Sequence, residues 1–176
     1  SARCAIRSLP TSGLLGTTNL GALVLPILRG ASVAAAVCDP APTEAKSRLR
    51  LAAYSAAPLC ASTAQQISES RRSNAAAAAA RSIESAAYVP VFGDDLIGFV
   101  ASAVSGSFRA ASGTNHASAA RSAAHSEAEK LERVQDGAQI FATPLWPGGK
   151  VHEGLSAALD TLHVFCDANT ETWGFW

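Results

Sequence analysis

Residues Asn74 to Ile83 read NAAAAAARSI, inside an alanine- and serine-rich run that extends from about Ala61 to Ala87. Alanine has the highest helix propensity, and its methyl side chain keeps a helix narrow. A narrow helix lets neighbouring helices approach closely, but it brings little apolar area to a core. The run therefore predicts a central, close-packed helix, and the larger core side chains must come from other parts of the chain.

Length and composition predict one helical domain. The chain has 176 residues, which suits a single domain that buries roughly 70% of its unfolded surface. Hydrophobic residues make up 48%, but alanine supplies much of that fraction and buries little area per residue. Strand signals are nearly absent, because the β-favouring segment from Tyr88 to Phe92 contains Pro90. We therefore predict an all-α fold over residues 1–176, an irregular bundle of about five to seven helices with the alanine-rich helix at its centre.

Prolines, glycines and capping residues divide the chain into helical segments. A break at residues 39–42 is followed by Thr43, which caps a new helix. Pro26 kinks or splits one helix, and Pro58 kinks a long helix or ends one, with a restart near Ser62. The expected helices cover approximately residues 1–9, 19–37, 43–57, 62–88, 96–108, 114–138 and 150–166.

Apolar side chains recur at helical spacing on four of these segments. The segment 19–37 has the densest aliphatic cluster, and on 114–138 the stripe is mainly alanine, including Ala124 and Ala128. Gly98 and Gly106 weaken the helix at 96–108 but allow a close approach. The other stripes are Leu20, Leu23, Val24, Ile27 and Leu28; Leu96, Phe99, Val100, Ala103, Val104 and Phe108; and Val151, Leu155, Leu159, Leu162 and Cys166.

The charge balance argues against two classes of partner. The chain has 14 basic and 14 acidic residues, whereas a nucleic-acid binder needs a basic excess on one face. A membrane helix needs about 20 consecutive apolar residues, and the apolar block at 14–28 is interrupted by Gly16, Asn19, Gly21 and Pro26. We therefore expect neither a nucleic-acid partner nor a membrane partner.

The four cysteines, Cys4, Cys38, Cys60 and Cys166, show no paired spacing of the kind that metal and redox motifs need. We interpret them as buried or half-buried free thiols in a reducing, cytoplasmic compartment. A disulfide between Cys4 and Cys38 stays open as an alternative.

Titratable residues offer few candidates for chemistry. Asp94 and Asp95 precede a predicted helix, and capping explains them without a catalytic role. His125 and Glu129 lie one helical turn apart, which predicts a surface ion pair rather than a metal site. We therefore predict no catalytic, cofactor-binding or metal-binding residues and no cofactor. The alternative is a helical enzyme or effector with a site assembled from Asp94, Asp95, His116, His125 and Glu129.

Two further histidines are interpreted structurally. His152 and Glu153 are adjacent and point in different directions on a helix, so they do not form a catalytic pair. His163 falls beside the apolar stripe of the last helix and is expected to be half-buried and hydrogen-bonded.

The C-terminal third contains a Thr143-Pro-Leu-Trp-Pro147 loop, then a helix, then Thr172-Trp-Gly-Phe-Trp176. This pattern resembles uncharacterised alanine-rich helical proteins of proteobacteria, in which a Trp-x-x-Trp ending continues into further aromatic residues. The resemblance implies an intracellular bacterial setting and a larger parent protein, and it supplies no site residues. The absence of methionine and the aromatic ending also predict that the chain is a piece of a longer or processed protein.

These observations favour a non-enzymatic helical interaction or scaffold domain. Alanine-rich faces suit tight helix association, either with the rest of the parent chain or with a second copy. Trp146, Trp173 and Trp176 have no neighbouring basic residues in the sequence, so they are expected to be packing anchors or an interface.

Overall fold

The structure is a computed structural model that describes residues 2–15, 20–36, 43–70, 73–89, 91, 96–112, 117–133, 144–146, 149–151 and 153–168. These residues contain seven α-helices, one 3-10 helix and no strand, which confirms the all-α prediction. The elements are α1 (Ala2–Ser8), η1 (Leu9–Leu15), α2 (Leu20–Ala36), α3 (Thr43–Glu69), α4 (Asn74–Tyr88), α5 (Leu96–Ser112), α6 (Ala117–Arg133) and α8 (Glu153–Ala168).

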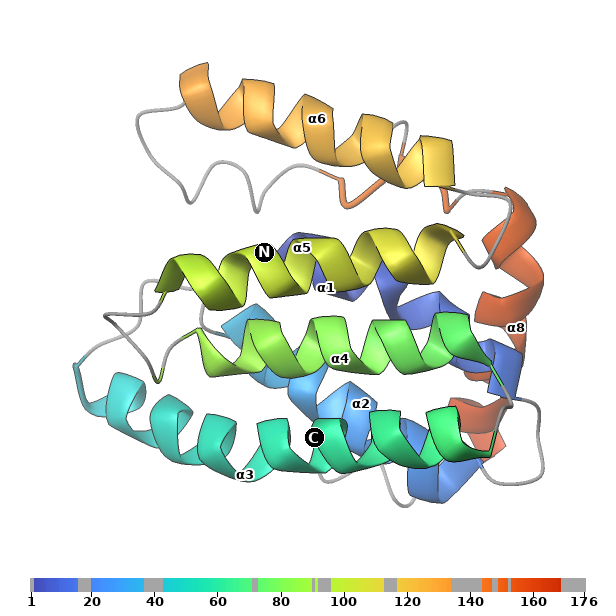
Figure 1. Cartoon of the computed structure of the whole chain (residues 1–176), viewed down its shortest axis with the longest axis horizontal. Coiled ribbons are helices and arrows are strands. Elements are labelled where there is room, and N and C mark those ends of the chain that lie inside the picture. Colours follow the sequence, from blue (N-terminus) through green and yellow to red (C-terminus); the bar gives the residue numbers. More distant parts are fainter. Residues whose placement is uncertain are drawn as a thin grey trace.

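Helices α3, α4 and α5 lie side by side and run in alternating directions, with α4 in the middle (Figure 1). Helix α2 packs against α3 and α4, and α1 packs against α4 and α5, so these two elements form a second layer. Helix α8 packs on η1, and α6 lies along α5 at the edge of the bundle.

The alanine-rich helix α4 is the centre of the bundle, as predicted. Its side chains are buried from Ala75 to Ala87 except for one narrow stripe that contains Asn74 and Arg81. Ser73 caps the helix, because its side chain accepts a hydrogen bond of 3.2 Å from the backbone nitrogen of Ala76.

The largest fully buried side chains are Ile27 and Val24 of α2, Ile67 of α3 and Ile83 of α4. The contribution of α2 was expected from its aliphatic stripe. Ile67 and Ile83 were not, although they are the large aliphatic residues of the alanine- and serine-rich run. The core is therefore built around α4 partly from the run itself.

Two glycines bring neighbouring helices into close contact. A Cβ atom at Gly106 of α5 would lie 2.9 Å from Cβ of Ser82, and one at Gly30 of α2 would lie 2.5 Å from Sγ of Cys60. Gly106 therefore has the predicted close approach. Gly98 is exposed at the start of α5, and for this glycine the close approach stays a prediction.

The boundary between α3 and α4 differs from the predicted one. Helix α3 continues through Pro58 and ends at Glu69, and α4 begins at Asn74, so the boundary between them does not lie near residue 58. Pro58 is exposed on the outside of α3. The break follows local chemistry, because the Ser70 hydroxyl donates to the backbone oxygen of Ile67 and Ser73 caps the next helix.

The alanine stripe expected on α6 is rotated from the prediction. Among the α6 side chains that the structure describes, Ala123 is buried, Ala124 is half-buried and Ala128 is exposed. Helix α5 also differs, since its Phe99, Val100, Val104 and Phe108 are half-buried and Ala103 is fully buried. On α5 small residues face the bundle, because the close approach of α4 at Gly106 leaves no room for larger ones.

Candidate functional site

The exposed stripe of α4 forms the floor of a groove between α3 and α5, with a volume of about 740 Å³. We call it the α4 groove. Alanines and a glycine form the apolar part of its surface, and the other lining residues are polar or charged. The lining residues are Ser68, Asn74, Ala77, Ala78, Arg81, Glu84, Ser85, Ala101, Ser102, Ser105, Gly106 and Arg109.

The register of α4 against α5 places the two arginines of the groove close together. Gly106 packs on Ser82, and the Ser82 hydroxyl donates to the backbone oxygen of Ala103. The two helices run in opposite directions. A residue three positions after Gly106 on α5 therefore lies beside the residues of α4 that come about one turn before Ser82. Arg109 therefore lies within about one turn of Arg81 on the same face.

The charged side chains among the described lining residues are two arginines and one glutamate. Arg81 and Arg109 are exposed, and within the described part of the chain neither makes an ion pair. Glu84 is half-buried, and its burial raises the pKa of the carboxyl group, while the nearby Arg81 acts in the opposite direction. The groove thus presents two guanidinium groups and one carboxyl group among serine hydroxyls.

A second surface runs along the outside of α3. Leu51 is 71% exposed, Tyr54 55% and Leu59 42%, and Pro58 lies exposed between them. We call these four residues the α3 face. They recur at helical spacing, opposite to the buried Ala53, Ala56, Ala57 and Cys60. Helix α3 is therefore apolar on two sides, and only one of them is covered by the bundle.

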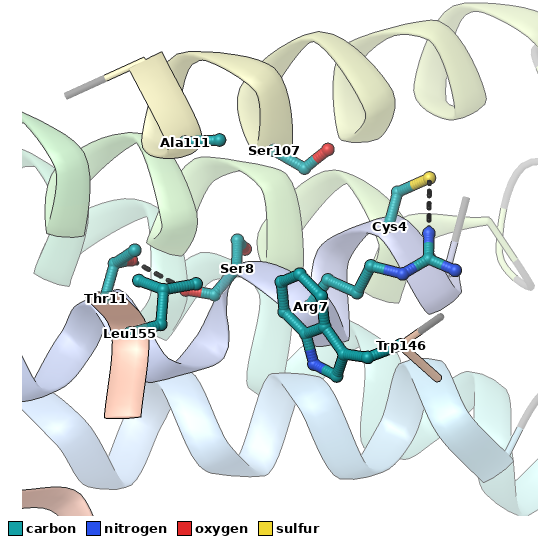
Figure 2. A pocket seen from close by; sticks show the side chains of 8 residues that line it. All are labelled: Cys4, Arg7, Ser8, Thr11, Ser107, Ala111, Trp146 and Leu155. Carbon is teal, nitrogen blue, oxygen red and sulfur yellow. Dashed lines mark hydrogen bonds between the residues drawn. The ribbon is translucent and has the colours of Figure 1, made fainter. Parts of the chain in front are cut away.

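A small cavity lies between α1, η1, α5 and α8, and Figure 2 shows its lining residues. Its volume is about 20 Å³, enough for one water molecule and no substrate. Arg7 and Trp146 lie next to each other on one side of it, and Nη1 of Arg7 lies 3.9 Å from Sγ of Cys4. The buried indole confirms Trp146 as a packing anchor.

Two buried arginines of α1 hold the loop that carries Trp146. Nη2 of Arg3 donates to the backbone oxygen of Pro144 at 2.7 Å, and Nε of Arg7 donates to that of Leu145 at 2.6 Å. Trp146 therefore does have a basic neighbour, which the sequence separation hid. The role of this region is structural, because its charged groups are occupied by the loop backbone.

Cys60 is a buried thiol at the junction of α2, α3 and α4. Its Sγ donates to the backbone oxygen of Pro26 at 3.1 Å. Burial is the main cause that raises its pKa to about 12, and the nearby Glu84 adds to it. Burial also raises the pKa of Tyr88, with smaller contributions from Glu84 and Cys60. A thiol that stays protonated at neutral pH is a poor nucleophile, and Cys60 is a buried free thiol, as predicted. Cys4 is likewise a buried free thiol.

The residues named for an alternative enzymatic site are only partly described. His125 and Glu129 form the predicted surface pair on α6, with Nε2 and Oε1 3.4 Å apart and side chains 79% and 54% exposed. Asp94, Asp95 and His116 lie outside the described residues. Among the described residues no group of three His, Cys, Asp or Glu side chains is arranged to hold a metal ion.

The structure also describes His163, which was expected to be half-buried and hydrogen-bonded. His163 is exposed rather than half-buried, because it points away from the buried Leu155 and Leu162 of α8. His152, Cys38, Trp173 and Trp176 lie outside the described residues. The disulfide between Cys4 and Cys38 that the sequence left open is contradicted, because Cys4 is a free thiol. No helix in the described ranges combines the length and apolarity that a membrane crossing requires.

Sequence reasoning did not identify the α4 groove or the α3 face. A signal for the α3 face was present, since Leu51, Tyr54 and Pro58 follow one another at intervals of three and four residues. Arg81 and Arg109 are 28 positions apart, and only the register of α4 against α5 brings them together. Comparisons of the chain with protein-family models, curated proteins and solved structures found no match, which leaves its own geometry as the basis for a function.

Proposed function

We propose that the chain is a non-enzymatic helical interaction domain, which associates with a second copy of itself through the α3 face. The observation that carries this proposal is the exposure of Leu51 and Tyr54 on a helix whose other side is already packed. Large apolar side chains grouped on one exposed helix face are typical of an interface. A partner helix that covers them would remove this apolar area from water.

The charges along α3 favour a second copy as the partner. Exposed basic residues lie toward its amino end, at Lys46, Arg48 and Arg50, whereas Gln65 and Glu69 are exposed near its carboxyl end. A twofold axis across the α3 face would set two copies of α3 antiparallel, so that the basic end of each meets Glu69 of the other. A parallel arrangement would instead bring the basic ends together.

The expected dimer is weak. One helix pair buries less area than a standard interface of about 1,600 Å², so the association belongs to the transient class. We expect the association to weaken as ionic strength rises, because salt screens the attraction between opposite charges at the rim.

Sedimentation equilibrium over a range of protein concentrations tests the proposal. The unaltered chain should show a mass that rises toward that of a dimer, and the double variant Leu51→Glu with Leu59→Glu should remain monomeric. Ile97→Glu is the matched control, because Ile97 is 84% exposed but lies on α5. A monomer at every concentration, or a dimer that survives both charges on the α3 face, would overturn the proposal.

The setting of the domain is part of the same proposal. We infer a bacterial cytoplasm and a larger parent protein, supported by the resemblance of the Pro-Leu-Trp-Pro loop and the terminal tryptophans to alanine-rich proteobacterial proteins. The two buried free thiols, Cys4 and Cys60, agree with a reducing compartment.

A further inference from the structure

We propose that the α4 groove binds the phosphate monoester of a small polyhydroxy compound, with Arg81 and Arg109 holding the phosphate. This inference is independent of self-association, because the groove and the α3 face share no residue. The volume of about 740 Å³ lies within the range of roughly 300–1,000 Å³ that is usual for small-molecule sites.

The two arginines supply the charge that recognises the phosphate. They come from neighbouring helices and lie within about one turn of each other, so one phosphate group can reach both. A guanidinium group forms paired hydrogen bonds with phosphate oxygens, and it keeps its charge at every physiological pH. Among the described residues neither arginine makes an ion pair, and Glu84 is the acidic lining residue that interacts with Arg81.

The remaining lining determines the rest of the ligand. Hydroxyl groups come from Ser68, Ser85, Ser102 and Ser105, and an amide comes from Asn74. The apolar part of the lining consists of the methyl groups of Ala77, Ala78 and Ala101, and none of the lining residues that the structure describes is aromatic. Such a surface offers hydrogen bonds to hydroxyl groups but no platform on which a nucleobase could stack. A sugar or polyol phosphate therefore fits better than a nucleotide.

Glu84 makes the groove selective. Its carboxylate repels a phosphate bound at Arg81, but it accepts hydrogen bonds from the hydroxyl groups of a polyol. Bare inorganic phosphate thus meets the repulsion without the compensating hydrogen bonds. The groove is expected to bind the organic ester more tightly than the free ion.

Titration calorimetry with three probes, ribose 5-phosphate, ribose and inorganic phosphate, tests this site. Ribose 5-phosphate should bind most tightly, inorganic phosphate more weakly, and ribose not at all. Arg81→Gln and Arg109→Gln should each weaken ribose 5-phosphate binding by about tenfold or more, since each removes a charged hydrogen-bond donor. Glu84→Gln should strengthen the binding of inorganic phosphate.

The controls separate this site from other charges and from self-association. Arg121→Gln removes an exposed arginine on α6, outside the groove, and should leave the affinity unchanged. The double variant Leu51→Glu with Leu59→Glu should also bind ribose 5-phosphate normally. Adenosine monophosphate should bind no more tightly than ribose 5-phosphate. The proposal is overturned if ribose 5-phosphate does not bind at millimolar concentration, if ribose binds equally well, or if the two groove variants bind as tightly as the unaltered chain.

Discussion

Helices α4 and α6 have similar lengths, 15 and 17 residues, and both are rich in alanine, but their surroundings differ completely. In α4 the alanines from Ala75 to Ala87 are almost all buried, whereas the corresponding stripe of α6 is exposed at Ala128. Alanine therefore determines that a segment is helical but not that it is buried. Whether an alanine helix is buried depends on whether the backbones of neighbouring helices come close enough to contact its methyl groups.

For α4 the neighbouring helices provide that surface through small residues of their own. Gly106 of α5 packs on Ser82, and nearby Ala103 and Ala110 are fully buried. Helix α6 has no equivalent partner among the described helices, since it lies along α5 at the edge of the bundle (Figure 1). Methyl-sized side chains pack well only where both surfaces are small.

Enlarging one alanine in each helix should give the largest difference. Ala80→Leu in α4 places three extra carbon atoms at a fully buried position, and we expect it to lower the free energy of unfolding by about 3 kcal/mol or more. Ala128→Leu in α6 faces solvent and should change it by about 0.5 kcal/mol or less. Urea unfolding followed by circular dichroism measures both values. Equal losses would show that α6 is packed as tightly as α4.

Two glycines of α5 sharpen the comparison within one helix. Gly106→Ala places a Cβ atom 2.9 Å from Cβ and 3.0 Å from Cα of Ser82, so the helices must separate, at a cost of about 1–2 kcal/mol. Gly98→Ala lies at an exposed position and should stabilise the domain by about 0.5–1 kcal/mol through helix propensity. Thermal unfolding of the two variants should therefore shift in opposite directions. A stabilised Gly106→Ala variant would disprove the tight contact.

The start of α4 depends on a local cap rather than on its neighbours. Ser73→Ala removes the acceptor for the backbone nitrogen of Ala76 and should cost about 1 kcal/mol. Ser73→Asp keeps an acceptor at the same position and should retain most of the stability. Urea unfolding of both variants gives the measurement, and an unchanged alanine variant would mean that packing alone positions the helix.

The smallest expected effect is on the pH dependence of stability, and it compares Glu84 of α4 with Glu129 of α6. Because burial raises the pKa of Glu84, the folded domain binds its proton more tightly than the unfolded chain does, and stability is lost as pH rises through the carboxyl range. Glu84→Gln should remove this loss, so its advantage over the unaltered chain should grow between about pH 4 and pH 7. Solvent screens this half-exposed group, which limits the gain to a few tenths of a kcal/mol.

Glu129→Gln in α6 is the matched control. Glu129 is 54% exposed and pairs with His125, so its removal should give no such advantage at neutral pH. Unfolding curves at several pH values compare the two variants. If the two behave alike, burial of Glu84 has no measurable effect.

The helices of this protein could be predicted from local sequence, but the way in which they pack against each other could not. The alanine run, the aliphatic stripe of α2 and the surface pair of His125 and Glu129 all follow from spacing within one helix. The outer side of α3 and the rotation of α6 do not, because an apolar or alanine stripe carries no information about which neighbour covers it. For the same reason the pairing of Arg81 with Arg109 could not be predicted, since it depends on how Gly106 sets α5 against α4.

The contacts of Arg3 with Pro144 and of Arg7 with Leu145 join residues 141 and 138 positions apart. During synthesis α1 leaves the ribosome well before this loop, which follows only after on the order of ten seconds, at about 5–20 residues per second. Until then the two guanidinium groups stay in water and η1 lacks the α8 surface on which Gly13 rests. The nascent chain can thus assemble α2 to α5 early, but α1 completes its side-chain contacts only after the loop at Pro144 and Leu145 has been made.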